Sequence, residues 1–200
     1  MTEHAIRSGP ETVRYAFDAS QSRFTVQAFA RGALSALGHS PTFAIRSFTG
    51  EVSCAGDMGL GSVIHLTVRA DSLALTDSVS AKDREEIESR MRQEVLETAS
   101  YPEIVFRSTE ISAVKIADGW YRLAIAGTLS LHGATNVHRL DAQFRLMEDE
   151  ARLSGDCTLM QPAFGIKRVS ALAGMIQLKD ELKFSFDLVG RKQSSETRTE

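Results

Sequence analysis

Apolar and polar residues alternate at every second position through most of this chain, which is the pattern of half-buried β-strands. In 140–146 and 182–188 the even positions are apolar and the odd ones polar, and 23–28 repeats the pattern. Weaker alternation covers five further ranges, 42–52, 62–70, 102–111, 120–131 and 151–159. The pattern therefore predicts eight strands.

Short turn sequences separate these runs. Asp118-Gly119 is a strong turn former, and His132-Gly133-Ala134 divides two further runs. Strands joined by short turns pair antiparallel, and closing the sheet removes its exposed edges. We expect one mainly all-β domain over 13–190, an eight-stranded antiparallel barrel. The polar ends, 1–12 and 191–200, are expected to be disordered tails.

One stretch, from about 80 to 98, departs from the alternation. It contains strong helix formers and neither glycine nor proline. Ile87, Met91 and Val95 recur at every fourth residue and would form one apolar stripe. We expect a single inserted helix that caps one mouth of the barrel.

Composition and charge exclude several classes of partner. A net charge of -3 provides no positive field for nucleic acid. The sequence contains no run of about 18 apolar residues, so it predicts no transmembrane segment. Residues 1–10 do not resemble a signal peptide. We therefore expect a cytoplasmic protein. Cys54 and Cys157 lie too far apart for metal-ligand or redox spacing.

The histidines are the candidate acid–base groups, because histidine titrates near neutral pH. An enzyme using His39, His132 or His138 is one interpretation, although no G-x-S-x-G nucleophile motif accompanies them. His132 and His138 flank a predicted turn and could meet across a hairpin. The simpler interpretation is a pair of polar turn residues. No histidine pair has zinc-site spacing, so we expect neither a metal nor a cofactor.

Six short motifs occur in a characteristic order along the chain. They are Tyr15-Ala-Phe-Asp18, Phe48-Thr-Gly50-Glu-Val52, Tyr101-Pro102-Glu-Ile104-Val-Phe106, Gly127-Thr-Leu129-Ser-Leu131-His132-Gly133, Phe164-Gly165-Ile166 and Asp180. With these motifs the chain resembles the YceI-like family of polyisoprenoid-binding, lipocalin-like barrels from about Tyr15 to Val189. It departs from the family at Gln21, where many members have histidine, and at Gln161-Pro162, where many have arginine and aspartate.

The resemblance implies a barrel with an apolar tunnel that holds an isoprenoid or fatty-acyl chain, as a carrier, store or sequestering protein without catalytic activity. Family members are often dimers, so a homodimer is compatible with it. Composition alone leaves a filled barrel equally open, because small inward residues can also fill a tapering core. We expect ligand contacts from Phe24, Val26, Leu66, Val68, Met91, Val95, Phe106, Leu129, Ala142, Phe144, Phe164, Phe184 and Phe186.

Overall fold

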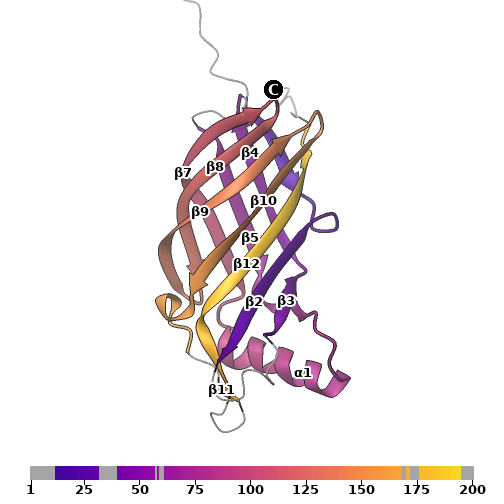
Figure 1. Cartoon of the computed structure of the whole chain (residues 1–200), viewed down its shortest axis with the longest axis vertical. Helices are drawn as coiled ribbons and strands as arrows, with labels where there is room; N and C mark the ends of the chain where they lie inside the picture. Colours follow the sequence, from indigo (N-terminus) through magenta and orange to yellow (C-terminus); the bar gives the residue numbers. More distant parts are fainter. Residues whose placement is uncertain are drawn as a thin grey trace, which may run out of the picture.

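The computed structural model describes residues 12–31, 40–56, 58, 61–167, 170–171 and 176–194. Its strands form one antiparallel sheet that closes as an eight-stranded barrel (Figure 1). The strands are β1 (Thr12–Phe17), β2 (Arg23–Arg31), β3 (Thr42–Ile45), β4 (Phe48–Ala55), β5 (Val63–Arg69), β6 (Leu73–Leu75), β7 (Glu103–Ala117), β8 (Trp120–Leu131), β9 (Ala134–Leu146), β10 (Glu150–Met160), β11 (Ser170–Ala171) and β12 (Ile176–Lys192). The predicted fold class is therefore confirmed.

Closure of the barrel depends on the long strand β12. The order around the barrel is β1-β4-β5-β7-β8-β9-β10-β12, and β1 pairs with β12 at Tyr15↔Lys192. Further down, β12 pairs with β2 instead, for example at Phe184↔Val26. Strands β3 and β6 continue the wall beyond β2. One strand thus spans both ends of an elongated barrel (Figure 1).

Several strands differ in extent from the predicted ranges. The range 42–52 is divided, because β3 ends at Ile45 and β4 begins at Phe48. Strand β9 begins at Ala134, six residues before the range with clean alternation. The alternation is lost in this first part because an inward position is occupied by a histidine rather than an apolar residue. Strands β1 and β12 extend slightly into the predicted tails; residues 1–11 and 195–200 lie outside the described residues.

The inserted helix is confirmed and covers the lower end of the barrel in Figure 1. Helix α1 (Ala81–Arg90) continues directly into the π-helical turn η2 (Met91–Val95). Ser80 caps its start by accepting a hydrogen bond from the Asp83 amide at 3.1 Å. Its end comes at Leu96, followed by Glu97 with a left-handed φ of 45°. We call α1, η2 and the two residues that follow them, Leu96 and Glu97, the lid.

The opposite end of the barrel is filled with side chains. Val52, Cys54, Leu123 and Phe144 are at most 1% exposed. Phe144 pairs with Tyr121 near the β7–β8 turn, and their ring centroids lie 6.4 Å apart. The described side chains therefore leave the space for a cavity in the part of the barrel nearer the lid.

Candidate functional site

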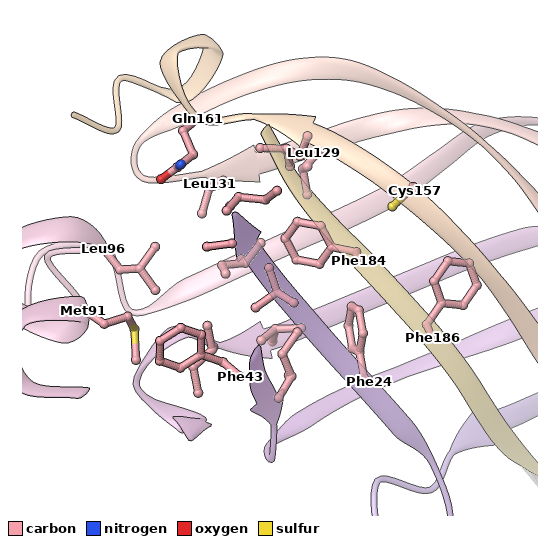
Figure 2. Close-up of a pocket in the computed structure, with 18 of the residues that line it drawn as sticks. Phe24, Phe43, Met91, Leu96, Leu129, Leu131, Cys157, Gln161, Phe184 and Phe186 are labelled. Carbon is pink, nitrogen blue, oxygen red and sulfur yellow. The ribbon is translucent and has the colours of Figure 1, made fainter. Parts of the chain in front are cut away.

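A cavity of about 480 Å³ lies inside the barrel between the filled end and the lid. Its walls come from inward positions of β2, β5, β8, β10 and β12, and the lid contributes Met91, Val95 and Leu96 (Figure 2). Natural ligand pockets occupy about 300–1,000 Å³, so the space is large enough for a small molecule.

Aromatic rings define one side of this cavity. Phe24 packs edge-on against Phe48, with ring centroids 5.9 Å apart. The ring centroids of Phe184 and Phe186 lie 6.3 Å and 6.4 Å, respectively, from the ring centroid of Phe24. Figure 2 shows Phe24, Phe184 and Phe186 along this wall. The alternation of apolar residues in β2 and β12 turns all three inward, because strand side chains alternate between the two faces.

Hydrogen bonds from two side chains of the lid to backbone groups hold α1 to strand β6 and the residues after it. Glu88 Oε1 accepts from the Leu75 amide at 2.9 Å. Arg84 donates to the Leu75 carbonyl and, at 2.8 Å, to the Asp77 carbonyl. These bonds explain why a helix of mainly polar residues stays in place with its few apolar side chains over the cavity.

The far end of the lid is held by His132 in the β8–β9 turn. Its Nε2 lies 3.2 Å from Glu97 Oε2, and its Nδ1 lies 3.3 Å from the carbonyl oxygen of Phe164. The ring of Tyr101 packs against it, with centroids 4.5 Å apart. His132 thus joins three segments at the rim and has a positional role.

Three polar or sulfur-bearing side chains reach the inner wall: His138 on β9, Cys157 on β10 and Gln161 at the start of the 3-10 turn η3 (Gln161–Phe164). Burial raises the pKa of the Cys157 thiol to about 11, with a smaller contribution from the charge of Asp156. Burial also lowers the pKa of His138 below its ordinary value. Both side chains are therefore held in their neutral forms near pH 7.

Ten of the thirteen residues expected to contact a ligand line this cavity. Their role as ligand contacts remains a prediction. The ten are Phe24, Val26, Leu66, Val68, Met91, Val95, Phe106, Leu129, Phe184 and Phe186.

Ala142, Phe144 and Phe164, the other three of the expected ligand contacts, do not line the cavity. Ala142 and Phe144 do point into the barrel, but Phe144 belongs to the filled end and Ala142 is packed within the same core. Phe164 lies in η3 and packs in a small cluster with Leu129 and Leu159. Alternation identifies the inward face of a strand and does not tell which part of that face borders empty space.

The two acid–base candidates that the structure describes, His132 and His138, do not come together. His132 occupies the turn, whereas His138 lies within β9, opposite Gly127. His39 lies outside the described residues. Among the residues that the structure describes, no three His, Cys, Asp or Glu side chains group as metal ligands. In the same part of the chain, no helix is long and apolar enough to cross a membrane.

Sequence reasoning missed His138 as a wall residue. The signal was present, because 138 has the same parity as the inward positions Leu140, Ala142 and Phe144. It also missed the wall residues of β3 and β6, because β6 is only three residues long and gives little alternation. These further wall residues are Phe43, Ile45, Leu73 and Leu75.

Comparison with known proteins agrees with this geometry. The family model described as "YceI-like domain" matches residues 15–190. No curated protein sequence matches the chain.

Solved structures of the same fold include BcnA from Burkholderia cenocepacia, with a TM-score of 0.67 and 15% identity over 86% of this chain and 98% of that one. A polyisoprenoid binding domain from Saccharophagus degradans, implicated in plant cell wall breakdown, has a TM-score of 0.66 and 17% identity over 90% of this chain and 98% of its own. The YceI protein of Campylobacter jejuni has a TM-score of 0.57 and 11% identity over 75% of this chain and 84% of its own.

Proposed function

This chain belongs to the YceI-like family, and we propose that its barrel binds one long apolar molecule, an isoprenoid or fatty-acyl chain. The bound molecule is carried, stored or sequestered rather than converted. One observation carries the proposal: an apolar cavity of about 480 Å³ beneath the lid, inside a barrel whose other end is filled.

The wall chemistry supports an apolar occupant. Among the described residues that line the cavity, those with a polar or thiol side chain are Asp77, Arg90, His138, Cys157 and Gln161. All other lining side chains are apolar. Each methylene group transferred from water to such a wall contributes about 0.8 kcal/mol. A long hydrocarbon chain therefore gains affinity from its length alone and needs few directional contacts.

The structural relative from Saccharophagus degradans points the same way, because its description is that of a polyisoprenoid binding domain. The match between the two structures covers nearly all of that domain. At 17% identity the likeness establishes a common barrel, and the ligand class comes to this chain as part of the proposal.

The experiment is native mass spectrometry of the freshly purified full chain, followed by extraction with organic solvent. We expect one non-covalent adduct per chain that is released into the organic phase. The extracted protein should then take up added geranylgeraniol or oleic acid in a one-to-one ratio. Protein that carries no adduct and takes up neither probe would contradict the proposal.

A further inference from the structure

The polar side chains that line the cavity divide into two places. Asp77 and Arg90 belong to the lid and the segment before it, and both already have partners. Asp77 Oδ2 accepts from the Thr42 amide at 2.8 Å. Arg90 Nε lies 3.4 Å from Glu94 Oε2. The two charged side chains that line the cavity therefore lie at its lid end, and each already has a partner there.

The inner wall carries the second group: His138, Cys157 and Gln161. Gln161 Nε2 donates to the Lys179 carbonyl oxygen at 3.0 Å. The Cys157 thiol is a weak donor and acceptor. His138 is different, because its Nε2 is buried and has no hydrogen-bond partner among the described residues. Buried polar nitrogens are nearly always paired, so an unpaired one indicates a missing partner.

The neighbours of His138 along the wall do not supply that partner. Directly opposite it on β8 is Gly127, which has no side chain. The ring of Phe106 fills the space there, since a Cβ at 127 would lie 2.6 Å from its Cζ. The next inward residue on β9 is Leu140, which also lines the cavity. The imidazole is therefore a single hydrogen-bonding group on an apolar stretch of wall.

The surroundings of His138 also indicate that the group that pairs with it is uncharged. Burial lowers the pKa of His138, so the imidazole is neutral and can donate from one nitrogen and accept at the other. Among the described residues that line the cavity, no lysine or arginine side chain joins His138, Cys157 and Gln161, since Arg90 lies on the lid. A carboxylate or phosphate placed there would be a buried, unpaired charge, which is strongly unfavourable. A hydroxyl or carbonyl oxygen satisfies the imidazole without introducing charge.

We propose that the bound molecule carries an uncharged oxygen group, a hydroxyl or a carbonyl, and that this group hydrogen-bonds to His138 inside the barrel. This inference rests on the proposed function and specifies the class of ligand and its orientation. The polar end of the molecule lies against β9, and the apolar chain lies along the wall of Phe24, Phe184 and Phe186.

The test compares four probes of one skeleton on delipidated protein: geranylgeraniol, geranylgeranial, geranylgeranyl diphosphate and the parent hydrocarbon without oxygen. Each probe displaces the uncharged fluorophore N-phenylnaphthylamine, which reports its affinity. We expect the alcohol or the aldehyde to bind about tenfold more tightly than the hydrocarbon, as one net hydrogen bond provides. The diphosphate should bind more weakly than the alcohol. The aldehyde can only accept a hydrogen bond, so its binding more tightly than the hydrocarbon indicates an imidazole that donates, whereas a preference for the alcohol alone indicates one that accepts.

Two variants complete the test. His138→Leu should abolish the preference for the oxygen-bearing probes over the hydrocarbon, and His138→Gln should restore part of that preference. Gln143→Ala, at an exposed position of the same strand β9 outside the cavity lining, should behave as the wild type. Equal binding of hydrocarbon, alcohol and aldehyde by the wild type would overturn the inference, as would a diphosphate that binds as tightly as the alcohol. If no probe displaces the fluorophore, the proposed function itself fails.

Discussion

Glu97 Oε2 lies 3.2 Å from Nε2 of His132, and this contact joins the end of the lid to the β8–β9 turn. The Glu97 side chain is half exposed, whereas the His132 side chain is only 13% exposed. The other ring nitrogen of His132 lies 3.3 Å from the Phe164 carbonyl oxygen. The lid is thus fastened through His132 to the β8–β9 turn and to η3.

Replacing His132 should therefore loosen the lid. We expect His132→Ala to speed the release of a bound probe by about fivefold at most, because one partly exposed polar contact contributes up to about 1 kcal/mol. Stopped-flow displacement of N-phenylnaphthylamine measures the rate. Lys115→Ala is the matched control, since it breaks the exposed Lys115–Asp118 pair near the filled end. Equal release rates in both variants would show that His132 does not hold the lid.

The filled and hollow ends of the barrel should differ in their response to truncation. Phe144 is fully buried at the filled end, so Phe144→Ala should cost about 3–5 kcal/mol of unfolding free energy. Phe184 already faces the cavity, and Phe184→Ala should cost at least about 1 kcal/mol less in delipidated protein. Urea unfolding measures both. Equal losses would mean that the two ends are packed alike.

The alkylation rate of Cys157 can report whether the cavity is occupied. Its pKa of about 11 predicts slow alkylation near pH 7, rising about tenfold per pH unit, because the thiolate is the nucleophile. Bound geranylgeraniol should slow the reaction with iodoacetamide further. Cys54, buried at 1% exposure away from the cavity, is the internal control in the peptide mass spectrum. An alkylation rate of Cys157 that does not change when geranylgeraniol is added would mean that the ligand binds elsewhere.

His138 should make stability depend on pH. Burial lowers its pKa in the folded state below the ordinary value of 6.5, so the unfolded chain binds the proton first as the pH falls. Stability contributed by the neutral imidazole is complete well above pH 6.5 and is lost as the pH falls through that value. We expect the Tm of the wild type, relative to that of His138→Leu, to drop between pH 7.5 and pH 5.5. Parallel Tm curves for the two proteins would contradict this.

How much of the site the sequence could reveal depended on the kind of signal. Period-two alternation placed Phe24, Phe184 and Phe186 inside the barrel, because strand geometry leaves two choices for each side chain. It placed Phe144 inside by the same rule, yet that ring packs in the filled end. The difference arises from how side chains of distant strands meet, which the pattern of a single strand does not contain.

Polar positions were harder to interpret. His138 follows the inward parity of β9, but its polarity suggested a turn residue, and the strand was predicted to begin later. The lid was easier, since the stripe of Ile87, Met91 and Val95 predicted the side that faces the cavity. The motif resemblance indicated the family, now shown over residues 15–190.

Retention of lipid by two tryptophan variants tests the central claim most directly. Ala28 lines the cavity, and Ala124 on β8 faces outward and is exposed. The lipid that co-purifies with each full-length variant is measured by extraction and mass spectrometry, and circular dichroism verifies that both remain folded. We predict that Ala28→Trp loses the bound lipid because the indole fills the cavity, whereas Ala124→Trp retains it at the wild-type level. Equal retention by the two variants, or no lipid in the wild type, would contradict the account.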